Sequence, residues 1–168
     1  DGAIYEGDFV DGWFQGKGKY TFPDPDGAIY EGDFVDGWFQ GKGKMTWQNG
    51  AIYEGDFVNG ERTGTGKYTW RNGNTYEGDF TNDARTGKGK YTFAGPDGAI
   101  YEGEFVNDLF QGKGKMTWRN GAIYEGDFVN DARTGKGKYT FPDPDGAIYE
   151  GDFVDGWFQG KGKMTWQN

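Results

Sequence analysis

Residues 1–22 read DGAIYEGDFVDGWFQGKGKYTF, and near copies of this stretch fill the rest of the 168-residue chain. The Tyr of each YEG triplet recurs after 23 or 25 residues, at Tyr5, Tyr30, Tyr53, Tyr76, Tyr101, Tyr124 and Tyr149. A fixed period of this length indicates a repeat architecture, in which each unit buries its apolar face against its neighbours. We expect one repeat domain over 1–168, with units at approximately 1–25, 26–48, 49–71, 72–96, 97–119, 120–144 and 145–168.

Each unit contains two stretches that alternate in polarity, as strands do. In AIYEGDF, Tyr5, Gly7 and Phe9 share one face, and GKGKYTF places glycines and aromatics opposite lysines. Asp11-Gly12 lies between them, and Asp-Gly is a strong signal for a two-residue hairpin turn. The sequence therefore predicts one β-hairpin per unit.

The hairpin turn also predicts a register. With Asp11-Gly12 at the turn, the pairs within the first hairpin are Phe9–Phe14, Gly7–Gly16, Glu6–Lys17 and Tyr5–Gly18. Each pair joins like faces, whereas a one-residue slip would mix them.

The connection between hairpins gives a second register. A three-residue loop at 48–50 pairs Met45 with Tyr53, Lys44 with Glu54 and Lys42 with Asp56. The five-residue loop PDPDG at 23–27 keeps the same parity and places Lys17 between Glu6 and Asp33. Charge ladders are thus expected on the polar face.

These pairings predict an all-β fold, an elongated single-layer antiparallel sheet of seven tandem β-hairpins. Glycine leaves space beside each aromatic ring, so Tyr5 is expected to cover Gly18. Regular strand glycines also imply bending or close approach. We expect a curved sheet whose aromatic–glycine face is concave.

The stretch YEGDFVDGWFQGKGKYTF at 5–22 resembles the MORN repeat, whose pattern is Y-E-G-x-F-x-x-G-x-x-x-G-x-G, and the resemblance extends to all seven units. It implies a solenoid of hairpins that acts as a scaffold or interaction module, either by holding a partner segment in its groove or by self-association. Many members carry His before the Gly-x-Gly pair. Here that position holds Gln15, Gln40, Thr63, Thr86, Gln111, Thr134 and Gln159, so a function that needs that His is not expected.

The composition argues against several function classes. A net charge of −9 disfavours binding to nucleic acid or to an anionic membrane surface. The chain has no Cys, His or Ser, so the commonest bases and nucleophiles of enzymes are missing. We expect no enzymatic activity and no cofactor.

Three acidic or basic motifs have both a chemical and a simpler structural interpretation. Glu6, Asp8 and their copies could act as paired carboxylates, but a row repeated in every unit suits a solvated charge ladder better. The GKGK motif lacks the spacing of a phosphate-binding loop. The PDPDG loops could bind Ca²⁺ weakly, although we favour rigid turns; their carboxylates are Asp24, Asp26, Asp143 and Asp145.

The units differ most just after each turn. The first position there holds Trp13, Trp38, Glu61, Ala84, Leu109, Ala132 and Trp157, and the second holds Phe14, Phe39, Arg62, Arg85, Phe110, Arg133 and Phe158. Arg62 is expected to face Phe57, where a cation–π contact can form. The Trp and Phe clusters of units one, two and seven form a candidate contact patch.

Two functional hypotheses remain from different classes. Residues 16–49 and 135–168 are identical, which indicates a recent, selected or engineered duplication, and neither end of the array carries an atypical capping unit. The first hypothesis is a structural protein that self-associates head-to-tail through two edge segments. Their residues are Tyr5, Glu6, Gly7 and Asp8 at one edge and Lys161, Gly162, Lys163 and Met164 at the other. The second is a monomeric module that binds a partner peptide or helix in an aromatic groove lined by Tyr53, Phe57, Tyr76 and Phe80.

Overall fold

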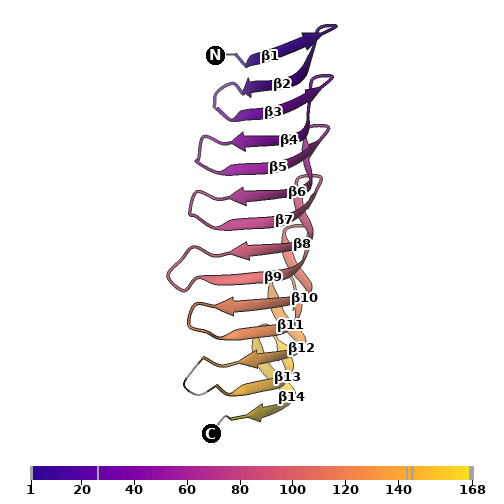
Figure 1. Ribbon diagram of the computed structural model, residues 1–168. Helices are drawn as coiled ribbons and strands as arrows, with labels where there is room; N and C mark the ends of the chain where they lie inside the picture. The colour runs from indigo at the N-terminus through magenta and orange to yellow at the C-terminus, as the bar shows by residue number, and fades with distance from the viewer. Residues whose placement is uncertain (1, 26, 143, 145, 167–168) are drawn as a thin grey trace. The chain divides into compact units, whose positions relative to one another are not determined.

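The computed structural model describes residues 2–25, 27–142, 144 and 146–166. The chain divides into two compact units, Asp1–Ala84 and Arg85–Asn168. Within each unit the strands follow one another in chain order, each antiparallel to the next, and Figure 1 shows the resulting succession of hairpins.

The first unit contains seven strands, and the second contains seven, of which the first begins one residue before the boundary. In the first unit they are β1 (Ile4–Val10), β2 (Trp13–Thr21), β3 (Ile29–Val35), β4 (Trp38–Thr46), β5 (Ile52–Val58), β6 (Glu61–Thr69) and β7 (Thr75–Thr81). In the second they are β8 (Ala84–Thr92), β9 (Ala99–Val106), β10 (Leu109–Trp118), β11 (Ile123–Val129), β12 (Ala132–Thr140), β13 (Ile148–Val154) and β14 (Trp157–Thr165). The predicted all-β fold of antiparallel hairpins is confirmed, and no helix occurs in the described part of the chain.

The tight turns have the backbone that a two-residue hairpin demands. Asp11 and Gly12 have φ angles of 50° and 84°, and Asn82 and Asp83 have 47° and 67°. Two successive residues in the left-handed region define a type I′ turn, which matches the twist of the flanking strands. The turns predicted from Asp11-Gly12 and its copies are therefore confirmed.

The register between hairpins also agrees with the prediction. Met45 pairs with Tyr53, Lys44 with Glu54 and Lys42 with Asp56. The longer loop gives the same register, with Gly18 opposite Gly32 and Lys17 opposite Asp33. Because three and five are both odd, the two loop lengths preserve which face each side chain occupies.

The register within each hairpin was predicted only in part. Phe9 does pair with Phe14, but Gly7 pairs with Gly18, Glu6 with Lys19 and Tyr5 with Tyr20. The predicted pairs Gly7–Gly16, Glu6–Lys17 and Tyr5–Gly18 are wrong. Lys17 therefore lies beside Asp33 but not opposite Glu6.

A β-bulge causes this shift. The pairing jumps between Gly7–Gly18 and Asp8–Gln15, which leaves Gly16 and Lys17 as extra residues on β2. Gly16 has a φ of 65°, a conformation that glycine adopts without steric cost. The bulge adds two residues, so it preserves the alternation of faces and was invisible to a parity argument.

The core lies on the aromatic face. Tyr30, Tyr53, Tyr101 and Tyr124 are completely buried, and each ring covers the paired glycines beside it. A Cβ added at Gly114, for example, would lie 2.5 Å from a ring carbon of Tyr101. The expected cover of a strand glycine by tyrosine is thus confirmed, and it extends to both members of the glycine pair.

The contact between Tyr101 and Gly114 predicts that even a methyl side chain at position 114 destabilises the fold. Gly114→Ala should lower the free energy of unfolding by about 1–3 kcal/mol, because the methyl group would enter space filled by the buried Tyr101 ring. The control is Gly95→Ala, since a Cβ there meets nothing within 4 Å and the residue has no positive φ. Urea unfolding of the two variants measures the difference. Equal midpoints would show that the glycine pair has no packing role.

Candidate interaction site

The four residues proposed to line a groove belong to the core. Tyr53, Phe57, Tyr76 and Phe80 have exposed fractions of 3% or less. The rings of Tyr53 and Phe57 meet edge to face with centroids 5.1 Å apart, and Tyr53 meets Phe80 in the same way. Their side chains therefore stabilise the sheet and present little surface to a partner.

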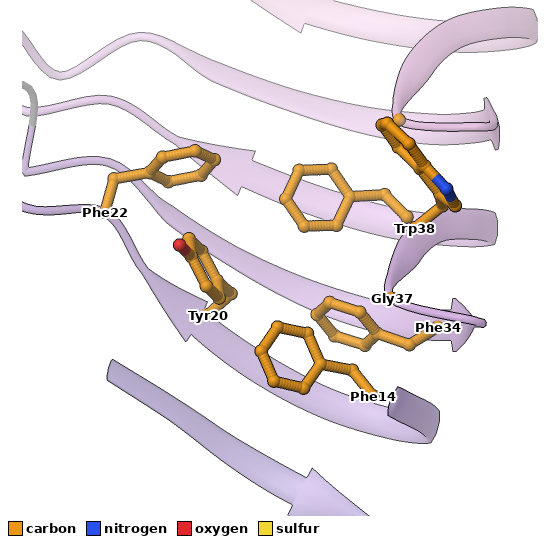
Figure 2. A pocket seen from close by; sticks show the side chains of 8 residues that line it. Phe14, Tyr20, Phe22, Phe34, Gly37 and Trp38 are labelled. Carbon is orange, nitrogen blue, oxygen red and sulfur yellow. The ribbon is translucent and has the colours of Figure 1, made fainter. Parts of the chain in front are cut away.

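An open groove lies beside them in the first unit. It has a volume of about 380 Å³, and its walls come from β2, β3, β4 and the turns at Gly37 and Gly60. The lining side chains are Phe14, Tyr20, Phe22, Phe34, Trp38 and Phe39. Figure 2 shows the rings of Phe14, Tyr20, Phe22 and Phe34 gathered on one face, with Trp38 at the turn end.

The two residues that follow the tight turn differ in burial, and both line this groove. We call the first two residues after each tight turn the post-turn pair. In Trp38–Phe39 the Phe stacks on Tyr30 at 3.9 Å and 15°, while 59% of the Trp surface stays exposed. The sequence signal for the groove was thus the Trp and Phe cluster of units one and two.

Arginine replaces the stacked Phe in other units. The Arg62 guanidinium lies 5.7 Å from the Tyr53 ring centroid and 5.5 Å from that of Phe80. Arg62 pairs with Phe57 in the sheet, as expected. Arg62 does make cation–π contacts, but with the rings of Trp47, Tyr53, Tyr68 and Phe80 and not with that of Phe57, as had been expected.

On the polar face, the Asp of YEGDF joins two hairpins. One oxygen of Asp56 accepts a hydrogen bond from the backbone N–H of Thr65 at 2.9 Å, in the bulge of its own hairpin. The other oxygen forms an ion pair of 2.5 Å with Lys42 of the preceding hairpin. The Lys42 ammonium is the main cause that lowers the pKa of Asp56.

The ion pair recurs at three other hairpins. Asp33, Asp127 and Asp152 pair with Lys17, Lys113 and Lys136 at 2.5–2.6 Å. The backbone N–H of Lys136 and of Lys161 donates to Asp127 and Asp152. Asp33, Asp56, Asp127 and Asp152, which are copies of Asp8, therefore lie in Lys–Asp pairs, as the charge-ladder interpretation expected.

The two predicted edge segments lie on β1 and β14, each with one neighbouring strand among the described residues. Phe9 is 59% exposed, whereas its counterpart Phe34 is 1% exposed. At the other edge Phe158 is 40% exposed, against 7% for its counterpart Phe110. These two edge rings are thus far more exposed than their interior counterparts.

The two edge segments carry complementary charges. On β1, Glu6 and Asp8 are exposed, and on β14, Lys161 and Lys163 are exposed. Gly7 and Gly162 are also exposed, and Tyr5 and Met164 are half-buried. Acidic side chains thus dominate one edge and basic side chains the other.

The structure does not test the predicted Ca²⁺ binding by the PDPDG loops. Within the described residues, no group of three or more acidic, His or Cys side chains converges as a metal site would. Asp26, Asp143 and Asp145 of the PDPDG loops lie outside the described residues, so the Ca²⁺ interpretation stays a prediction. Over the same described part of the chain, no helix has the length and apolarity needed to cross a membrane.

Comparison with known proteins agrees with this geometry. The family model for the MORN repeat matches seven segments, at residues 5–24, 30–52, 53–75, 76–95, 101–123, 124–143 and 149–168. The chain belongs to the MORN-repeat family. No curated protein gave a significant match.

A solved structure has a fold similar to the one seen here. It is the TCP domain of SAS-4 (dCPAP) from Drosophila melanogaster, solved in complex with a proline-rich motif of Ana2 (dSTIL). The TM-score is 0.54 and the identity 16%, over 97% of this chain and 88% of that chain. At this identity the likeness establishes the fold alone.

The MORN pattern can now be explained residue by residue. Its Tyr covers the glycine pair, and the Tyr53 hydroxyl donates to the Asp56 carbonyl at 2.8 Å. Its first Gly is the partner of the last Gly across the hairpin, as Gly55 is of Gly66. The third Gly, such as Gly41 with a φ of 66°, forms the bulge. MORN repeats are a structural type of repeat, and the pattern residues named here have structural roles.

Burial of the hydroxyls of the repeat tyrosines predicts that the folded chain loses stability at alkaline pH. Burial, with a smaller contribution from Asp56, raises the pKa of Tyr53 to about 12, and that of Tyr124 is raised to about 12 in the same way. An exposed phenol titrates near pH 10, so the unfolded chain loses protons first. The stabilisation is complete below about pH 10 and is lost as the pH rises towards 12.

Urea unfolding between pH 8 and 12 should therefore give a falling free energy of unfolding above about pH 10. Absorbance at 295 nm, which reports tyrosinate, should rise together with loss of the strand circular-dichroism signal. Complete ionisation of tyrosine near pH 10 with the sheet intact would contradict the prediction. Tyr53→Phe should reduce the pH dependence and also lose one hydrogen bond.

Proposed function

We propose that this MORN-repeat chain is a non-catalytic scaffold that self-associates head-to-tail, with β14 of one copy pairing with β1 of the next. The observation that supports it is the interior register. Between β4 and β5, Gly41 pairs with Phe57, Lys42 with Asp56, Gly43 with Gly55, Lys44 with Glu54 and Met45 with Tyr53. The same pattern across two copies joins Gly160 to Phe9, Lys161 to Asp8, Gly162 to Gly7, Lys163 to Glu6 and Met164 to Tyr5.

Burial and charge both favour this contact. In the interior, Phe34 of one hairpin packs on Tyr5 and Phe14 of the preceding one, at 5.0 and 5.9 Å between centroids. A second copy would place Phe9 against Tyr149 and Phe158 in the same way. Lys161 would then reach Asp8 as Lys42 reaches Asp56. An exposed strand edge also offers backbone groups to another chain.

Other effects oppose the association. Loss of translational and rotational freedom costs about 4–15 kcal/mol, and a net charge of −9 makes copies repel one another at low salt. Covering one phenylalanine contributes only about 1.5–3 kcal/mol. We therefore expect assembly at high protein concentration, strengthened by moderate salt that screens the net charge.

The test is sedimentation velocity of the 168-residue chain at rising concentration and at moderate salt. The parent should form larger particles, and Phe9→Asp should remain monomeric, because the charge would be buried between copies. The control is Val10→Asp, since valine at this position is exposed both at the edge and in the interior, at 55% for Val10 and 49% for Val35. Val10→Asp should associate like the parent. A parent that stays monomeric throughout would refute head-to-tail association.

The open groove supports a second candidate function, which is peptide binding. Aromatic grooves suit proline-rich segments in the polyproline II conformation, because such segments are extended and lose little entropy on binding. The groove of Phe14, Phe22, Trp38 and Phe39 has this character. The SAS-4 TCP domain, which shares the fold, was solved with a proline-rich motif.

Fluorescence titration with a synthetic proline-rich peptide tests this second function. Trp38→Ala should reduce the affinity by about tenfold or more, as expected when a central aromatic anchor is removed. The control is Trp157→Ala, because Trp157 is 78% exposed and lies outside the groove. Equal losses in both variants would rule out the groove as the binding site.

A further inference from the structure

Each tight turn after the first contacts the post-turn pair of the preceding hairpin. The N–H of the second turn residue donates to the carbonyl of the second residue of that pair. Gly37 donates to Phe14 and Asp83 to Arg62, both at 3.0 Å, and Gly156 donates to Arg133 at 2.9 Å. This contact repeats once per hairpin and brings the most variable positions of the repeat together.

Tryptophan in the post-turn pair meets glycine in the next turn. A Cβ on Gly37 would lie 3.1 Å from a ring carbon of Trp13, and a Cβ on Gly60 would lie 3.1 Å from Trp38. Such a distance is tighter than ordinary van der Waals contact, so a larger turn residue would force the indole to move. In the described chain, both Trp-containing pairs that are followed by a turn face Gly there.

Arginine in the post-turn pair can instead use aspartate in the next turn. One oxygen of Asp83 accepts from both the backbone N–H and the Nε of Arg62, at 3.0 and 2.9 Å. Asp108 does the same for Arg85, also at 3.0 and 2.9 Å. Arginine also tolerates glycine, since Nη2 of Arg133 donates to the Gly156 carbonyl at 2.8 Å. A post-turn pair with Trp is thus followed by a turn with Gly, whereas a pair with Arg is followed by a turn with either Asp or Gly.

The two edges of the chain are complementary by this rule. Trp157 and Phe158 form the post-turn pair of β14, and Trp157 is 78% exposed. The first tight turn of the described chain is Asp11-Gly12, and a Cβ on Gly12 would meet nothing within 4 Å. Within the described residues, a Trp pair without a following turn thus lies at one edge, and a Gly turn without a preceding pair lies at the other.

We infer that the match between post-turn pair and turn residue determines which partner edge β14 accepts, so that Trp157 docks over Gly12 of a second copy. The inference rests on the proposed head-to-tail association and adds its specificity. Gly12 N–H would donate to the Phe158 carbonyl, as Gly37 does to Phe14. An edge whose turn carries Asp would be rejected by Trp157 and accepted by an arginine pair.

Compensating substitutions at the two edges test the match. Gly12→Asp should weaken self-association by about tenfold, because the new side chain would crowd Trp157 of the second copy. A tenfold change corresponds to about 1.4 kcal/mol. The backbone accepts Asp there, because Asp83 and Asp108 occupy the same turn position with φ of 67° and 71°. Adding Trp157→Ala and Phe158→Arg to Gly12→Asp, which copies Ala84–Arg85 and its Asp turn, should restore association. Sedimentation velocity measures all three chains.

A second measurement tests the match inside one chain and needs no association. Gly37→Asp should lower the melting temperature, and adding Trp13→Ala and Phe14→Arg should recover part of the loss, although Arg gives up the Phe14 stacking on Tyr5. If the parent chain stays monomeric, the head-to-tail proposal fails and the docking of Trp157 fails with it. If the parent associates but Gly12→Asp associates equally, or if compensation fails in both measurements, the matching rule alone is overturned.

Discussion

The packing of one tyrosine ring over two paired glycines is the contact on which the rest of the repeat depends. Gly55 and Gly66 pair across a hairpin, and both would clash with Tyr53 if they carried a Cβ. The ring can lie flat on the sheet only because both glycines lack side chains. Its hydroxyl then reaches the Asp56 carbonyl, next to the point where the register shifts. The ring thus satisfies a backbone acceptor at the bulge while it fills the core.

The polar face is organised around the same bulge. The carboxylate of Asp56 accepts from the bulged strand with one oxygen and from Lys42 with the other. Exposed ion pairs contribute little to stability, about 0–1 kcal/mol each, so Lys42 matters more for register than for energy. The bond to the bulge N–H is different, because it gives an acceptor to a backbone donor at the point where the register shifts. The YEGDF segment supplies the carboxylate that binds the bulge N–H and the tyrosine that covers the paired glycines. The GKGK segment supplies the bulge glycine, and its lysine pairs with the carboxylate of the next hairpin. The two segments therefore occur together.

The sequence allowed most of the fold to be predicted and less of the site. Alternation and turn chemistry predicted the hairpins and the pairing of Lys44 with Glu54, because face parity is strict in a sheet with one buried side. The bulge at Gly16 was missed, because two extra residues leave parity unchanged. Tyr53 and Phe57 were predicted as groove residues, but a ring that packs on glycine becomes buried by its neighbours. The exposed Trp38 was recognisable from its variability, although its groove depends on how Phe39 stacks.

The post-turn pair and the second turn residue vary between repeats, and they lie where neighbouring hairpins meet. An array of near-identical hairpins needs the same backbone pairing at every step, so the pairing alone cannot distinguish one neighbour from another. Phe39 and Arg62 both occupy the surface of a buried tyrosine, yet Arg62 brings a charge that needs an acceptor in the next turn. Asp83 supplies that acceptor, whereas a turn that follows Trp38 has room only for Gly60. The variable residues are thus coupled in pairs across the boundary between hairpins, and this coupling gives an otherwise uniform sheet a means to specify order.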